Sequence, residues 1–154
     1  MSASEPPPFR IDREPFAGFE VAVLTDRPVY APGQTVRLSV SVTNAGDRFV
    51  EHHYPGWQRY HLSVRDELHR VVADDEVTRG ADTAAVDRWL PGQTVIFPVY
   101  WNQHEGPLVP GWTHEAPGPR AAPGRYRARV TWLGREPGER RTLPDVFSRW
   151  FELT

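Results

Sequence analysis

The sequence contains no cysteine and no lysine, and it has no long apolar run. Without cysteine, the chain cannot form a disulfide framework, a thiol nucleophile or a thiolate metal site. No stretch approaches the roughly eighteen consecutive apolar residues of a membrane-spanning helix. Residues 1–13 are rich in proline and lack the apolar segment of a signal peptide. These absences predict a cytoplasmic protein that does not contact a membrane.

The charge of the chain has little excess of either sign. All 18 basic residues are arginine, they are balanced by 20 acidic residues, and the formal net charge is -2. Proteins that bind nucleic acid through its phosphates usually carry a clear positive excess. We therefore expect no nucleic-acid partner.

Sequence motifs of catalysis are also missing. The chain has no nucleophile elbow, phosphate-binding loop, dinucleotide-binding turn or zinc-protease helix motif. The acidic run at residues 74–76 is typical of a solvated turn rather than of a pair of catalytic carboxylates. We expect a protein that is not an enzyme, with no catalytic residues and no cofactor.

Three Pro-Gly turns, at residues 32–33, 91–92 and 123–124, each precede a segment in which apolar and polar residues alternate. Proline presets φ for a turn and glycine accepts the positive φ that follows. Alternation with a period of two is typical of a strand with one buried face. The repeated pattern predicts an all-β protein, an immunoglobulin-like antiparallel β-sandwich of seven to eight strands.

The chain divides into a flexible, Pro-rich arm at residues 1–15 and a single sandwich domain at residues 16–154. Strands are expected at residues 19–23, 36–43, 49–50, 60–64, 71–72, 95–101, 126–132 and 147–153. A loop is expected at residues 52–57, and an irregular segment at residues 73–88 with one helical turn at residues 83–86. The longest loop, residues 102–123, contains five prolines, which keep it out of a sheet.

Between Val40 and Trp132 the chain resembles the BsuPI family of bacterial intracellular proteinase inhibitors, which act on subtilisin-like serine proteases. The resemblance covers about two-thirds of the chain, and the connection at residues 103–123 is longer than is usual in that family. It is carried by Val42-Thr43-Asn44, the segment Gly56 to Asp66, Val71-Val72, Trp89-Leu90-Pro91-Gly92-Gln93, Trp101 and Pro123-Gly124-Arg125-Tyr126. A shorter match, at residues 25–36, resembles the opening strands of macroglobulin-type domains.

This resemblance implies a non-enzymatic protein that inhibits a subtilisin-like protease by presenting a restrained loop. An extended segment at residues 106–112 could lie in the protease cleft and place an apolar side chain in a pocket. Its prolines would reduce the entropy lost on binding. The candidate partner-binding residues are Leu108, Val109, Trp112, His114, Tyr54 and Trp57.

Two other functions remain open from the sequence. A structural or assembly module would contact other chains through a sheet edge or the N-terminal arm, whereas an inhibitor is expected to be a monomer. Carbohydrate binding would use Trp57 and Trp112, because aromatic side chains on restrained loops are common recognition anchors.

Three histidines near one another in sequence, His52, His53 and His61, raise the possibility of a metal site. Adjacent strand residues point to opposite faces, so one site cannot easily use both His52 and His53. We therefore expect no metal site here.

Arginine and tryptophan side chains complete the candidates. Arg125, Arg127 and Arg129 alternate on one strand, which favours a solvated face over a stripe that binds phosphate or an acidic partner. Trp89, Trp101 and Trp132 occupy expected inward positions and are predicted to lie in the core.

Overall fold

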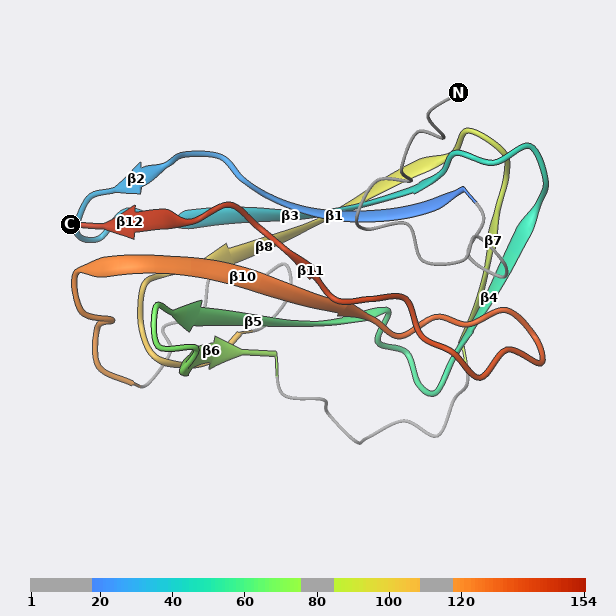
Figure 1. Ribbon diagram of the computed structural model, residues 1–154. Helices are drawn as coiled ribbons and strands as arrows, with labels where there is room; N and C mark the ends of the chain where they lie inside the picture. Colours follow the sequence, from blue (N-terminus) through green and yellow to red (C-terminus); the bar gives the residue numbers. More distant parts are fainter. Residues whose placement is uncertain (1–17, 76–84, 109–117) are drawn as a thin grey trace, which may run out of the picture.

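The computed structural model describes residues 18–75, 85–108 and 118–154, and this part of the chain is built from β-strands (Figure 1). The longer strands are β1 (Phe19–Thr25), β3 (Val36–Asn44), β4 (Val50–Tyr54), β5 (Tyr60–Asp66), β6 (Val71–Asp74), β7 (Ala85–Trp89), β8 (Thr94–Trp101) and β10 (Gly124–Trp132). The shorter strands are β2 (Val29–Tyr30), β9 (Gly106–Pro107), β11 (Val146–Phe147) and β12 (Phe151–Leu153). Among the described residues, no helix is long and apolar enough to cross a membrane.

Two sheets face each other and a separate ribbon lies at one end of them (Figure 1). The first sheet has the order β1-β3-β8, and the second has the order β2-β12-β10-β5-β6-β9, with β11 also paired to β10. Strands β4 and β7 form the ribbon. The prediction of an immunoglobulin-like β-sandwich is confirmed, but the described residues form twelve strands rather than seven to eight. Pairing is antiparallel except between β2 and β12 and between β6 and β9, which are parallel.

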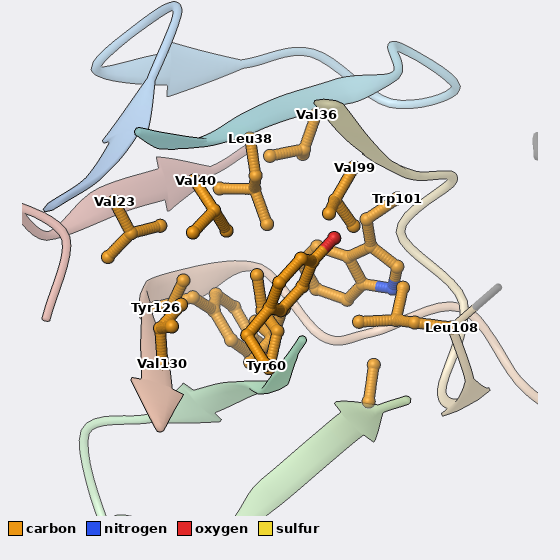
Figure 2. Packing of buried hydrophobic residues seen from close by; sticks show 14 of the residues in the cluster. Val23, Val36, Leu38, Val40, Tyr60, Val99, Trp101, Leu108, Tyr126 and Val130 are labelled. Atoms are coloured by element: carbon orange, nitrogen blue, oxygen red, sulfur yellow. The ribbon is translucent and has the colours of Figure 1, made fainter. Parts of the chain in front are cut away.

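Alternating burial along the strands explains how the two sheets hold together. In β3 and β10 every second residue is buried, so one face of each strand enters the core while the other remains more accessible. Figure 2 shows side chains from both sheets meeting in this core. Trp89, Trp101 and Trp132 are buried as predicted, and their large apolar area compensates for the absent disulfide.

The first two Pro-Gly turns have the same construction. Gly33 and Gly92 have φ values of 78° and 80°, which favour glycine over other residues. The glutamine after each glycine donates its backbone N–H to the residue before the proline, with N···O distances of 3.1 and 3.0 Å. Its side-chain Oε1 then accepts the N–H of that same residue, at 3.0 Å in both turns. Each Pro-Gly-Gln turn is thus closed by two hydrogen bonds of the glutamine, one from its backbone and one to its side chain.

Four segments differ from the expectations drawn from the sequence. Residues 106–107 were expected in a loop that its prolines keep out of a sheet, but they form β9 at the edge of the second sheet, beside β6. The segment expected to be a loop from residue 52 is a strand as far as Tyr54, because β4 pairs with β7. Ala85 and Val86 lie in β7 rather than in a helical turn, and residues 83–84 lie outside the described residues. The final strand is divided into β11 and β12 by an interruption at residues 148–150. The predicted arm at residues 1–15 also lies outside the described residues.

Candidate functional site: an aromatic pocket

A pocket of about 420 Å³ opens where the loop after β4 meets β5, β7 and β8. Five aromatic or aliphatic side chains and five polar or charged ones line it, and apolar atoms form most of its accessible wall. The lining residues are Trp57, Gln58, Arg59, Tyr60, Asp87, Arg88, Trp89, Gln93, Val95 and Phe97. Mostly apolar concave sites with a small number of polar groups are the usual form of ligand pockets in proteins.

Trp57 is held at this pocket by its neighbour Arg59. The Arg59 guanidinium donates from Nη1 to the carbonyl oxygen of Trp57 at 2.5 Å. It also binds both carboxylate oxygens of Asp87, with distances of 2.8 Å from Nε and 3.1 Å from Nη2. The Trp57 residue is nevertheless 51% exposed. A large aromatic side chain is therefore presented to solvent from a segment whose backbone is tied to β7.

Most polar groups of the wall already have partners within the protein. Gln58 donates from Nε2 to the Tyr60 carbonyl at 2.9 Å, and Gln93 accepts the N–H of Leu90 as part of its turn. Two buried atoms, Gln58 Oε1 and Trp89 Nε1, have no hydrogen-bond partner among the described residues. The pocket therefore offers a ligand mainly apolar surface, with one buried acceptor and one buried donor behind it.

The six candidate partner-binding residues have different places in the structure. Trp57 lines the pocket and is accessible. Tyr54 is only 2% exposed because it packs edge-on against Trp132. Leu108 is 6% exposed and lies beside Trp101 (Figure 2). The expectation that Tyr54 and Leu108 contact a partner is corrected, because the core already buries both side chains.

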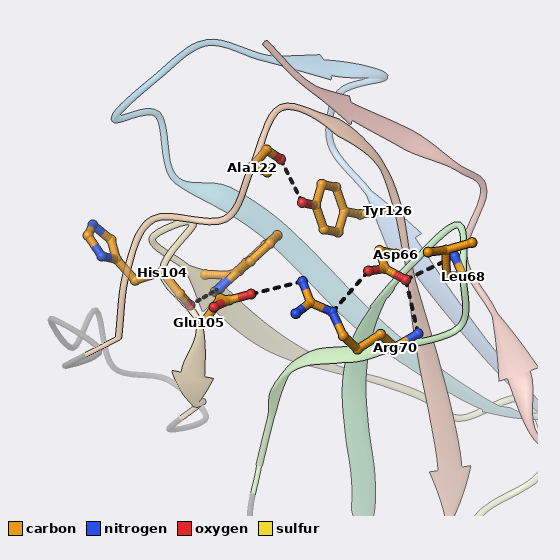
Figure 3. A network of polar contacts seen from close by, with 8 residues as sticks. Asp66, Leu68, Arg70, His104, Glu105, Ala122 and Tyr126 are labelled. Carbon is orange, nitrogen blue, oxygen red and sulfur yellow. Dashed lines mark hydrogen bonds and ion pairs between the residues drawn. The ribbon is translucent and has the colours of Figure 1, made fainter.

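Val109, Trp112 and His114 lie outside the described residues, but both ends of their loop are well defined. Glu105 donates its backbone N–H to the carbonyl oxygen of Pro119 at 2.8 Å. His104 Nδ1 lies 2.9 Å from the carbonyl oxygen of Gly118, and Trp101 Nε1 donates to the carbonyl oxygen of His104 at 2.8 Å (Figure 3). The two ends of the loop are thus fixed beside each other.

Gln103 attaches this loop to the first Pro-Gly turn. Its fully buried side chain donates from Nε2 to the carbonyl oxygens of Ala31 and Gln34, at 2.8 and 2.7 Å. Its φ of 68° is unusual for a residue other than glycine. Local strain of this kind persists only where the surroundings impose it, and here the two hydrogen bonds do so.

The pocket and the described ends of the loop, residues 102–108 and 118–123, lie at opposite ends of the sandwich. Strand β10 begins just after the loop, at Gly124, and ends at Trp132, which pairs with the pocket residue Tyr60. Nine strand residues span about 26 Å at roughly 3.3 Å each. A small ligand in the pocket therefore cannot also contact the described ends of the loop.

The three histidines do not form one cluster. His52 faces the core, where its Nδ1 accepts a hydrogen bond from Trp132 Nε1 at 3.0 Å, and its burial lowers its pKa to about 4. His53 points to the other side of β4 and pairs with Glu51 at 2.9 Å. His61 pairs with the buried Asp75 at 2.5 Å, a contact that raises the pKa of His61. Within residues 18–75, 85–108 and 118–154, no three metal-ligating side chains come together.

Arg59, Gln58 and Asp87 were missed in the sequence. Arg59 and Asp87 are 28 residues apart, and residues 73–88 carry no pattern that identifies a strand. The second Pro-Gly turn could have indicated β7. A turn of this kind joins two strands, so the residues before it, which end in Arg88 and Trp89, could have been predicted to form a strand.

Comparison with known proteins finds similarity to solved structures. No family model and no curated protein matches it. Among solved structures, it is similar to a CARDB domain from Pyrococcus furiosus in complex with di-metal ions, with 10% identity, 90% of each chain covered and a TM-score of 0.47. It is also similar to a β-glucosidase from Erythrobacter marinus (16% identity, TM-score 0.45) and to the sporulation control protein Spo0M from Bacillus subtilis (14% identity, TM-score 0.44).

These matches differ in how much of the other protein they involve. The matched region spans 88% of this chain but 15% of the β-glucosidase, and 89% of this chain but 49% of Spo0M.

Proposed function

We propose that this protein is a non-enzymatic binding domain that takes an apolar side chain of a partner protein into the pocket beside Trp57. The observation that carries the proposal is a restrained, half-exposed tryptophan at the mouth of an apolar cavity of about 420 Å³. Tryptophan is among the residues that contribute most to binding energy at protein interfaces.

The state of the polar groups favours an apolar ligand over a sugar. Carbohydrate recognition needs several free donors and acceptors beside an aromatic ring. Here Arg59 and Asp87 bind each other and Gln93 is used by its turn, which leaves the buried Gln58 Oε1 and Trp89 Nε1 as the groups of the wall without a partner among the described residues. An aromatic or aliphatic side chain needs few such groups and gains from leaving water. The carbohydrate alternative, which would use Trp57, is therefore the weaker one.

The class of partner that we propose is a subtilisin-like serine protease in the cytoplasm, following the resemblance in the sequence. The fixed ends of the loop at residues 102–123 support this choice, because a loop held at its base loses less entropy on binding. The pocket, at the opposite end, would then take a second contact on the protease or on another protein. We expect the free protein to be a monomer.

The function is tested by titrating the protein against a subtilisin-like serine protease while residual activity and the intact mass of the protein are followed together. Inhibition with an unchanged mass is the expected result. Cleavage at residues 109–117 without inhibition would make the loop a substrate, and no effect on activity would remove this protease as a partner.

The pocket is tested separately with N-acetyl-phenylalaninamide and N-acetyl-glycinamide as probes, followed through the indole N–H signals of a ¹⁵N-labelled sample. Only the phenylalanine probe is expected to shift the Trp57 and Trp89 signals. Trp57→Ala should weaken this binding at least about tenfold, the effect of removing an interfacial anchor. Leu68→Ala is the matched control, because Leu68 is an exposed apolar residue outside the pocket. Equal binding by both variants would exclude the pocket.

Two further measurements decide between the remaining alternatives. Oligosaccharides that quench tryptophan fluorescence, where the phenylalanine probe has no effect, would favour carbohydrate binding. Self-association in size-exclusion chromatography with light scattering would favour an assembly module. Pro98 in the edge strand β8 argues against association through that edge, because it lacks the N–H that a new strand would bind.

A further inference from the structure

The outer face of the second sheet carries a set of arginines on two neighbouring strands. Arg125, Arg127 and Arg129 project from the same face of β10, since Tyr126, Ala128 and Val130 between them are buried. Arg65 of β5 lies directly opposite Arg127 in the register of the two strands. The sequence favoured a fully solvated face for these arginines, but Arg127 and Arg129 are both partly buried.

The outer two arginines of β10 have carboxylate partners, whereas the central pair has none. Arg129 binds Asp145, which also accepts the hydroxyl of Thr131 at 2.8 Å. Arg125 lies 3.5 Å from Glu67. Among the described residues, neither Arg127 nor Arg65 forms an ion pair, and Arg65 donates from Nε only to its neighbour Ser63 on the same strand, at 3.2 Å.

Two aromatic rings hold the guanidinium of Arg127 in place. Its central carbon lies 4.2 Å from the ring centre of Phe147 and 4.7 Å from that of Trp150. Its Nε is buried without a hydrogen-bond partner among the described residues. Contacts with ring faces stabilise the cation and restrict its orientation. The side chain has thus lost much of its freedom without gaining a counter-ion.

Like charges directly opposite each other on paired strands destabilise a sheet. The Arg127 and Arg65 pair is destabilised in this way. The nearby acidic groups lie beside other residues: Glu67 and Asp145 contact the outer arginines. Glu152 is opposite Arg125, and Asp74 is opposite Ser63. An anion placed between the central arginines would remove the repulsion. Guanidinium groups bind oxyanions with two parallel hydrogen bonds.

We propose that Arg127 and Arg65 form a binding site for a phosphate group, with Phe147 and Trp150 holding Arg127 in the orientation that binding requires. The phosphate is either a free ion or a phosphoryl group on a partner chain. This site is on the outer face of the second sheet, whereas the aromatic pocket opens on the inner side of β5, so the two can be tested independently.

The site is tested by NMR with ¹⁵N-labelled protein, following the indole signal of Trp150 and the Arg Nε signals. Inorganic phosphate and chloride are titrated separately at the same pH and ionic strength. The chloride titration measures the general effect of salt, which phosphate also exerts on proteins that have no specific site for it. A phosphoserine peptide and its unphosphorylated form are titrated in parallel. The expected result is a saturable shift of the Trp150 signal with phosphate and not with chloride.

Variants then assign the effect to the central arginine. Arg127→Met should weaken phosphate binding about tenfold to a hundredfold, as expected for the loss of charged hydrogen bonds. Arg127→Lys should bind with intermediate affinity, because lysine keeps the positive charge but lacks the two parallel N–H donors of a guanidinium group. Arg37→Met is the matched control, since Arg37 contacts the Tyr100 ring at 5.4 Å on the other sheet. If Arg127→Met is not folded, Arg65→Met takes its place.

Tighter binding of the phosphoserine peptide than of inorganic phosphate would identify a phosphoryl group on a partner chain, and equal binding would identify the free ion. The proposal is overturned if phosphate shifts the signals no more than chloride does. It is equally overturned if the Arg127 and Arg37 variants respond alike. Trp57→Ala should leave the phosphate response unchanged, which separates this site from the pocket.

Discussion

Acidification should destabilise this protein through His52, a core histidine that cannot be protonated without cost. The side chain is 1% exposed, contacts Phe19 at a ring-centre distance of 4.2 Å and accepts the hydrogen bond from Trp132. Protonation would place a charge in an aromatic environment and remove the acceptor of that bond. Desolvation therefore lowers the pKa of His52 from 6.5 to about 4.

The direction of the pH effect follows from this lowered pKa. In the unfolded chain His52 takes up a proton as pH falls through 6.5, whereas in the fold it does so only near pH 4, so the unfolded state binds more protons between these values. The stability contributed by neutral His52 is complete above pH 6.5 and is lost as pH falls towards 4. The loss is about 2 kcal/mol at pH 5 and about 3 kcal/mol at most, since each pKa unit corresponds to roughly 1.4 kcal/mol.

Urea unfolding of the protein and of two variants from pH 7.5 to pH 4.5 measures this loss. His52→Gln should be less stable at pH 7.5, but its free energy of unfolding should fall less steeply with acid than that of the original protein. His69→Gln is the control, because His69 is an exposed histidine outside the core. Other titrating pairs, such as His61 with Asp75, contribute equally to all three proteins and cancel in the differences. If the His52 variant loses stability with acid as steeply as the original protein, the reasoning fails.

Three other substitutions test the packing around the core and the loop. Gly134→Ala should cost about 2–3 kcal/mol, because a Cβ at this position would lie 2.6 Å from Trp132 Nε1 and 2.8 Å from His52 Nδ1. Gly138→Ala, at an open position with a φ of 80°, should cost only about 1 kcal/mol, and equal losses in thermal or urea unfolding would contradict the steric explanation. Gln103→Ala should destabilise the protein by about 2–3 kcal/mol, because the two hydrogen bonds from its fully buried side chain to the carbonyl groups of Ala31 and Gln34 are lost. It should also speed proteolysis of the loop at residues 102–123, and an unchanged cleavage rate would show that Gln103 does not fix that loop.

The fold class could be predicted from particular residues because the signals are local. Pro91, Gly92 and Gln93 specify a turn by their own backbone preferences, and the alternation from Val95 to Trp101 specifies which residues face inward. The same reasoning correctly placed Trp89, Trp101 and Trp132 in the core. It failed for β4 and β7, whose pairing brings His52 opposite Asp87, since a strand that is stabilised by a distant partner need not carry a strong pattern of its own.

The candidate sites depended on relations that the sequence does not display. Leu108 looks like an exposed loop residue in a Pro-rich segment, yet the parallel pairing of β6 with β9 brings its backbone N–H to the carbonyl oxygen of Asp74 and its side chain into the core. Trp57 looked similar and is accessible. Neighbouring composition could not distinguish the two, because burial of a loop side chain is decided by the elements that pack over it.

The sequence by itself therefore determined the β-sandwich, its Pro-Gly-Gln turns and the inward faces of its long strands, all of which follow from backbone preferences and a period of two. Only the tertiary structure decided that Arg59 binds Asp87 beside Trp57 and that Arg127 lies opposite Arg65 between two aromatic rings. Both arrangements join residues far apart in the chain. They are fixed by strand register and by the packing of one sheet against its neighbours, which no local stretch of sequence contains.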